Sequence, residues 1–321
     1  MLLNISVPRQ YLISSYELSS FNTLKGEPST KPSPKDILNR SVLHLAAQRN
    51  LPDILVALIS AGMEVDGRDI AGRTPLHYAS SQGHVKVCRV LLQNQANINA
   101  ADKDYNTPLA FAAQMGRVEV ANLFLATAGI DVNFQTRLGY TPLMSAIRYE
   151  NESDAYKLLI AHPDVKLDLV NKLEETALHV AVQVVFVEGV EALLPECAEI
   201  INLVDHAGYQ ALHIATEIND EDDATDIVKL LLACEVIDAG QQNKNFETPL
   251  HIAAGKGYSQ ICRLLAVRID SGMLKRDKKG RTPLGVAAEK GFGETAQLLQ
   301  ERMKKFFAEA DTGSDSDEVE L

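Results

Sequence analysis

The chain contains no tryptophan, and aromatic residues make up only 6% of it. It has four cysteines in 321 residues, and none of them lies in a CxxC pair. This usage excludes a disulfide-stapled scaffold and fits a reducing compartment. Cys88 and Cys262 occupy the same position relative to a recurring phrase, and we interpret them as small apolar residues that fill helix contacts.

Long apolar runs are also missing. No stretch reaches the length of about 18 residues that a membrane-spanning helix needs, so we expect no membrane insertion. Residues 1–9 lack the basic start and apolar run of a signal peptide. We therefore expect a cytoplasmic protein that also has access to the nucleus.

The motifs that mark common catalytic sites are absent. The sequence has no P-loop, no GxGxxG, no HExxH and no GxSxG, so we expect no enzyme activity and no cofactor. Five histidines recur about one repeat apart, a ladder that cannot converge on one metal ion at about 2 Å. We expect no metal site, and we interpret these histidines as hydrogen-bond partners of loop backbone: His44, His77, His179, His213 and His251.

Positive charge is scarce as well, because 43 acidic residues outnumber 31 basic ones and give a net charge of −12. Neutralising nucleic-acid phosphates needs a basic surface, so the balance argues against a nucleic-acid partner. The last 14 residues, 308–321, hold six acidic groups and no basic group.

One short phrase is present in eight copies. Successive copies begin 33, 33, 34, 35, 34, 38 and 34 residues apart. A fixed period near 33 predicts a stacked solenoid of repeats. The copies begin at Ser41, Thr74, Thr107, Thr141, Thr176, Gln210, Thr248 and Thr282.

Residues 69–101 show how one repeat should fold. Thr74 is a good N-cap and Pro75 suits the first helical position, so a helix should run to about Gln82. Gly83 should end that helix, and a second helix should begin at His84 or Val85. The residues around Asp102 should then form an extended turn, which we call a finger.

These phrases resemble the ankyrin repeat, with its Thr-Pro-Leu-His core, over residues 37–307. The resemblance implies an all-α ankyrin-repeat solenoid of about eight helix-turn-helix units with β-hairpin-like fingers. Residues 1–36 would form an N-terminal extension or linker that can cap the first repeat. Residues 308–321 would form an acidic disordered tail.

Several repeats depart from the pattern. Tyr105, Glu174 and Phe246 stand where other fingers have glycine, so these fingers must use a positive φ without glycine or a different turn. Residues 183–189 have no early glycine, so the turn between the two helices of this repeat is expected to be unusual. Residues 219–224 are acidic and are expected to be an insertion between two helices.

The function implied by the resemblance is protein binding on the concave face, by a non-catalytic adaptor that is monomeric. Large aromatic and arginine side chains are common binding hot spots, so the finger residues of the third to seventh repeats are the first candidates. The alternative is that the rings only cover their own fingers. The predicted partner-binding residues are Tyr105, Arg137, Tyr140, Tyr149, Tyr209, Phe246, Lys278, Lys279 and Arg281.

The finger at 275–281 holds five basic residues in seven. Three interpretations stay open: a solvated finger, a site for an acidic partner or for the chain's own tail, and a nuclear import signal. For the whole protein, the alternatives to an adaptor are an inhibitor of a transcription factor, similar to NF-κB inhibitors, and the substrate-recruiting subunit of a ubiquitin ligase.

Two kinds of modification are also suggested. Thr312, Ser314 and Ser316 lie among acidic residues, a pattern similar to sites of acidophilic kinases. Asn99 and Asn133 each follow a leucine by eight residues, which resembles ankyrin sites of an asparaginyl hydroxylase.

Overall fold

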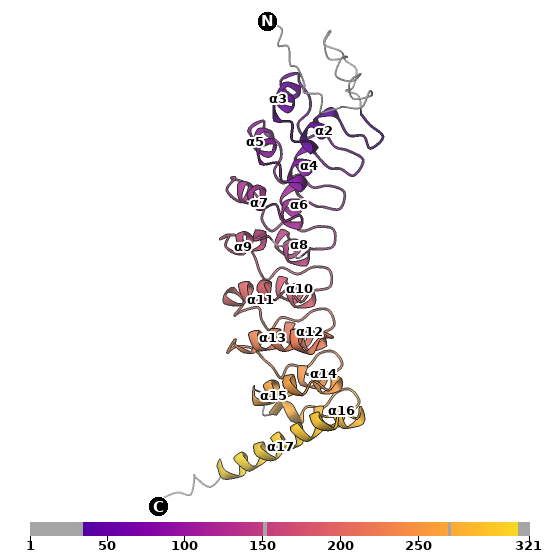
Figure 1. Ribbon diagram of the computed structural model, residues 1–321, viewed down its shortest axis with the longest axis vertical. Coiled ribbons are helices and arrows are strands. Elements are labelled where there is room, and N and C mark those ends of the chain that lie inside the picture. The colour runs from indigo at the N-terminus through magenta and orange to yellow at the C-terminus, as the bar shows by residue number, and fades with distance from the viewer. Residues whose placement is uncertain (1–34, 150–152, 269–270, 314–321) are drawn as a thin grey trace, which may run out of the picture. The chain divides into compact units, whose positions relative to one another are not determined.

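The computed structural model describes residues 35–149, 153–268 and 271–313. Most of the expected N-terminal extension, together with Ser314, Ser316 and the side chain of Thr312, lies outside the described residues. The chain divides into unit 1, which ends at Asp131, and unit 2, which begins at Val132. Each unit is a stack of helix pairs joined by fingers (Figure 1).

Every copy of the phrase begins a helix, and a second helix follows it. Unit 1 contains α2 (Val42–Gln48), α3 (Pro52–Ser60), α4 (Pro75–Gln82), α5 (Val85–Gln93), α6 (Pro108–Gln114) and α7 (Val118–Leu125). Unit 2 contains α8 (Pro142–Arg148), α9 (Ala155–Ile160), α10 (Ala177–Gln183), α11 (Val187–Leu193), α12 (Ala211–Glu217), α13 (Glu221–Leu232), α14 (Pro249–Lys256), α15 (Ser259–Arg268), α16 (Pro283–Glu289) and α17 (Gly293–Gly313). The 3₁₀ turns η2 (Leu194–Glu196) and η3 (Ser271–Leu274) follow α11 and α15.

The second repeat confirms the local expectations. Thr74 caps α4, Pro75 is the first helical residue, and Gly83 ends the helix with φ 78° in the left-handed region. Only glycine enters that region at little cost, so the chain turns there and α5 begins at Val85.

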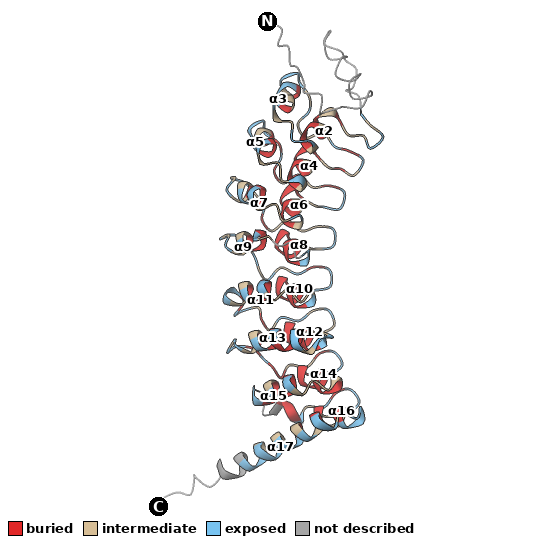
Figure 2. Cartoon of the chain, in the orientation of Figure 1, coloured by how far each residue is buried: buried red, intermediate tan, exposed pale blue. Residues whose placement is uncertain are grey.

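The core follows the repeated leucine of the phrase. Leu43, Leu76 and Leu109 have 0% exposure in unit 1, and Leu178 and Leu250 have 1% and 0% in unit 2. Figure 2 shows the first helices mostly buried and the second helices exposed along their outer faces. Burying one such side chain contributes about 1.5–3 kcal/mol, so the repeated leucine drives the stacking.

Cys88 and Cys262 are buried in helix contacts as expected, each with 0% exposure. Burial raises the pKa of both thiols to about 12. They therefore stay protonated near neutral pH and act as apolar side chains.

The fingers are closed like hairpins by main-chain hydrogen bonds. The Asp69 N–H donates to the carbonyl of Arg73 at 3.0 Å, and the Gly72 N–H donates back to the carbonyl of Asp69 at 3.0 Å. Consecutive fingers are linked in turn, for example by the Lys244 N–H donating to the Ala207 carbonyl at 3.1 Å. The fingers thus form a row along each unit without extended strands in the part of the chain that is described.

The fingers without glycine keep the same turn. Tyr105, Glu174 and Phe246 have φ of 62°, 61° and 59°, in the left-handed region that side chains resist. Val185 has φ 61° where the glycine between two helices is missing. An L-residue there costs roughly 1–2 kcal/mol, so these four positions carry strain.

The expected acidic insertion at 219–224 is wrong in its placement. Asp220 is an N-cap, and its carboxylate accepts from the N–H groups of Asp222 and Asp223 at 3.0 and 3.1 Å. Glu221 is then the first residue of α13. Carboxylates are favourable at a helix N-terminus, so the acidic residues belong to the start of α13 and lengthen this helix.

The last helix, α17, is 21 residues long. α17 continues to Gly313, so residues 308–313 of the expected tail are helical. No helix among the described residues is long and apolar enough to cross a membrane.

Candidate functional site

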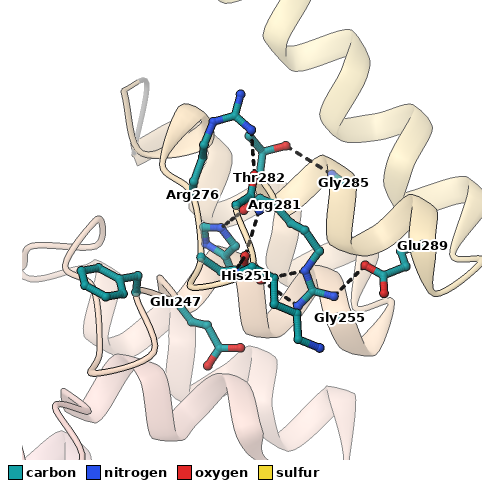
Figure 3. Close-up of polar contacts among 12 residues, drawn as sticks. Glu247, His251, Gly255, Arg276, Arg281, Thr282, Gly285 and Glu289 are labelled. Carbon is teal, nitrogen blue, oxygen red and sulfur yellow. Dashed lines mark hydrogen bonds and ion pairs between the residues drawn. The ribbon is translucent and has the colours of Figure 1, made fainter.

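The histidine ladder confirms the structural interpretation. The Thr74 N–H donates to His77 Nδ1 at 3.0 Å, and His77 Nε2 lies 3.0 Å from the carbonyl of Asn106 in the next finger. His44, His179, His213 and His251 repeat this arrangement. Figure 3 shows it for His251, which reaches the carbonyl of Arg281. Each ring therefore ties its own helix to the following finger.

This geometry requires neutral rings. Nδ1 must accept from a backbone N–H, while Nε2 donates to a carbonyl. Burial lowers the pKa of His77 and His213 from 6.5 to about 4. Burial also lowers the pKa of the other three ladder histidines. No group of three His, Cys, Asp or Glu side chains is arranged to hold a metal ion in the described part of the chain.

A side chain that accepts hydrogen bonds at the start of each finger was not singled out from the sequence. Asp69 Oδ1 accepts from the N–H groups of Ala71 and Arg73, both at 2.8 Å. Asp277 makes the same pair of bonds with Lys279 and Arg281 at 2.9 and 2.8 Å. The signal in the sequence is an Asp, Asn or Thr five residues before each cap, which holds the finger rigid.

The surface formed by the fingers and the first helices is called the inner surface below. Large side chains are exposed on it at predicted positions: Tyr105 is 52% exposed, Tyr149 53% and Phe246 54%. Arg137, Lys278 and Lys279 are exposed too. Exposed rings on a rigid row of fingers are suited to contact a protein.

Tyr140 and Tyr209 do not lie at the finger tips as expected. Each is half-buried at the base of its finger, just before the cap of the next helix. Arg148 Nη1 donates to the Tyr140 hydroxyl at 2.7 Å, and the Tyr209 hydroxyl donates to Glu217 at 3.0 Å. The residue just before the helix cap is Tyr140 in the fourth repeat, Glu175 in the fifth and Tyr209 in the sixth. A carboxylate therefore separates the two tyrosines in this series of equivalent positions.

Arg281 is engaged within its own repeat. Its guanidinium lies 2.7 Å from Asp277 and 2.6 Å from Glu289 (Figure 3). Arg276, Lys278 and Lys279 are the exposed basic residues of this finger, and Arg276 Nη1 donates to the Gly280 carbonyl at 2.7 Å.

A groove of 710 Å³ lies on the inner surface of unit 2, between the fifth and sixth repeats. Val185 and Ile218 provide apolar lining, and Tyr209 contributes its ring. The charged lining residues are all acidic: Glu175, Asp205, Glu217, Asp220 and Asp223. Sequence reasoning missed this groove because its acids come from a finger base, a helix end and a helix start that only folding brings together.

Asn99 and Asn133 bridge neighbouring repeats. Asn99 Nδ2 donates to the Gly129 carbonyl at 2.7 Å, and its Oδ1 accepts from the Asp131 N–H at 2.9 Å. Asn133 makes equivalent bonds with Asp164 and Lys166, and Asn202 does so with Val236 and Asp238. Hydroxylation of Asn99 and Asn133 stays a prediction, and it would require these bridges to open.

Comparison with known proteins agrees with this geometry. The family model described as "Ankyrin repeats (3 copies)" matches residues 12–102, 97–171, 151–233 and 219–309. Rabankyrin-5 of Mus musculus is 29% identical over 138 residues, which cover 43% of this chain and 11% of that protein. Neurogenic locus notch homolog protein 1 of Homo sapiens is 30% identical over 129 residues, 40% of this chain and 5% of that protein. The chain thus spans only a small part of these relatives.

Proposed function

Because the chain belongs to the ankyrin-repeat family, whose repeats are generally protein–protein interaction modules, we propose that it is a non-catalytic adaptor that holds a protein partner on its inner surface. The observation that carries the proposal is Phe246. Its ring is 54% exposed, and its backbone is in the left-handed region at φ 59°. Folding alone favours glycine at this position, so the exposed ring has a use other than stability.

The scaffold behind the ring is suited to binding. The Asn243 side chain accepts from the N–H groups of Asn245 and Glu247 at 2.8 and 2.9 Å, which fixes the finger that carries Phe246. The Lys278 N–H then ties the next finger to the Asn245 carbonyl at 2.9 Å. A preformed finger loses little conformational entropy on binding, so an exposed ring on it contributes more of its contact energy to affinity.

The test compares two glycine substitutions at the same finger position. Phe246→Gly removes an exposed ring, whereas Glu174→Gly removes an exposed polar side chain with the same φ. Wild type and both variants are used as baits for quantitative affinity purification. Proteins retained by wild type and Glu174→Gly but lost from Phe246→Gly support the proposal. Equal retention by all three baits contradicts it.

A further inference from the structure

The groove between the fifth and sixth repeats is negatively charged, and no basic residue in its lining balances that charge. Glu175 is only 4% exposed, and its Oε2 accepts from Asn171 Nδ2 at 2.6 Å. Among the described residues no Lys, Arg or His makes an ion pair with it. A carboxylate taken out of water without a cation is costly, so this one points to a positive group that arrives from outside.

In other repeats the residue equivalent to Glu175 contacts a side chain of its own repeat. Arg281 reaches Glu289, Tyr209 reaches Glu217 and Tyr140 reaches Arg148, in each case a residue eight positions later at the end of the first helix. In the fifth repeat the corresponding residue is Gln183, which is exposed and makes no hydrogen bond with Glu175 in the described structure. Glu175 therefore keeps acceptor capacity toward the groove.

Lys256 adjoins the groove in the described structure and interacts electrostatically with Glu217. Lys256 Nζ donates to the main-chain carbonyls of Glu217 and Ile218, the latter at 2.8 Å. It is thus held by backbone oxygens and is not among the residues that line the groove. The groove lining contains no Lys, Arg or His beside the carboxylates of Glu175, Asp205 and Asp223.

The molecule itself shows how this fold holds a guanidinium. Arg281 lies between the carboxylates of Asp277 and Glu289, and the guanidinium of Arg148 lies 5.2 Å from the centre of the Tyr140 ring. The groove offers both kinds of partner, because the Tyr209 hydroxyl bonds to Glu217 and Glu175 lies in the same lining. Guanidinium is planar, pairs with two oxygens and stacks on aromatic rings, which an ammonium group does less well.

We propose that this groove binds an arginine side chain of the protein partner, between the Glu175 and Glu217 carboxylates and against the Tyr209 ring. The inference rests on the proposed function, because it assigns a chemistry to part of the same inner surface. The acidic lining repels phosphate groups. The arginine therefore comes from a segment of the partner that is not bound to nucleic acid.

The probe is acetyl-arginine amide, titrated into the ¹⁵N-labelled full chain and followed by amide chemical shifts. Acetyl-citrulline amide has nearly the same shape without the charge and is the control ligand. We expect saturable shifts at Ala207, Tyr209 and Ile218, with a Kd on the order of 1 mM for so small a ligand. Citrulline should give no saturable shift there.

Two variants locate the effect. Glu217→Gln keeps an acceptor for the Tyr209 hydroxyl and should weaken arginine binding about fivefold or more. Glu191→Gln removes an exposed acid on α11, outside the groove, and should leave the Kd unchanged. Raising NaCl from 50 to 500 mM should also weaken binding several-fold. Equal binding of citrulline, shifts that map elsewhere, or an unchanged Kd in Glu217→Gln would each overturn the assignment.

The two proposals can fail separately. If arginine amide does not bind but capture still depends on Phe246, the groove assignment is wrong and the adaptor role stands. If arginine amide binds as expected but capture is insensitive to Phe246, the proposed use of the finger surface is wrong and the groove remains an arginine site.

Discussion

Replacing Phe246 by glycine should stabilise the fold while it removes a binding residue. The φ of 59° costs an L-residue roughly 1–2 kcal/mol, which glycine avoids. Glycine also has more freedom in the unfolded chain, which lowers the free energy of unfolding by about 0.5–1 kcal/mol. Phe246 is 54% exposed, so the burial lost with its ring is about half of the 1.5–3 kcal/mol of a fully buried Phe and offsets much of the gain. The expected net gain in the free energy of unfolding is therefore small, at most about 1 kcal/mol.

Glu174→Gly is the matched control, because Glu174 has φ 61° and is also exposed. Both variants should shift the midpoint of urea unfolding upward by similar amounts, measured by circular dichroism at 222 nm. Their free energies should come from matched fits with a common m-value. If Phe246→Gly lowers the free energy of unfolding by about 1 kcal/mol while Glu174→Gly raises it, the ring is a packing residue of the finger and the reasoning is refuted.

Three further predictions concern what holds the repeats together. His77 and His213 have a pKa of about 4 when folded and about 6.5 when unfolded. The unfolded chain therefore binds more protons, and their contribution is complete above pH 6.5 and is lost as pH falls toward 4, by on the order of 3 kcal/mol each. Urea unfolding at pH 7, 5.5 and 4.5 should show this decline, and constant stability over that range would argue against neutral buried rings. His77→Ala should cost about 1–3 kcal/mol, because it leaves the Thr74 N–H and the Asn106 carbonyl without their partner; a thermal melt equal to wild type would contradict the bridging role. Asp277→Ala should cost about 1–3 kcal/mol, since the N–H groups of Lys279 and Arg281 lose their acceptor, whereas Asp277→Asn keeps an oxygen there and should cost less; equal losses in chemical denaturation would assign the effect to the ion pair with Arg281 alone.

Much of the fold can be predicted because each repeat carries its own local signals. Thr74, Pro75 and Gly83 mark the bounds of α4. The missing finger glycines left two alternatives, a positive φ or a different turn, and the structure shows the positive φ at Tyr105, Glu174 and Phe246. These features depend on a few neighbouring residues, so the sequence alone contains them.

The inner surface could be predicted less well, because it depends on side-chain contacts between separate elements, the fingers and the helices. The pairs Tyr209–Glu217 and Arg281–Glu289 join a finger base to a helix end, and neither residue signals the pairing by itself. The acidic residues 219–224 were expected to be an insertion between two helices, but Asp220 caps α13 and Asp223 lies in this helix at the groove.

Site-specific photo-crosslinking tests the central claim, that a protein partner lies on the inner surface, most directly. A benzoylphenylalanine is placed at position 246 on a finger of the inner surface, or at position 267 on the outer helix α15, where Val267 is 64% exposed. After irradiation in a lysate of the cells that express the protein, covalent adducts should form from position 246 and not from position 267. Adducts that form from position 267 alone, or equally from both positions, would contradict the account.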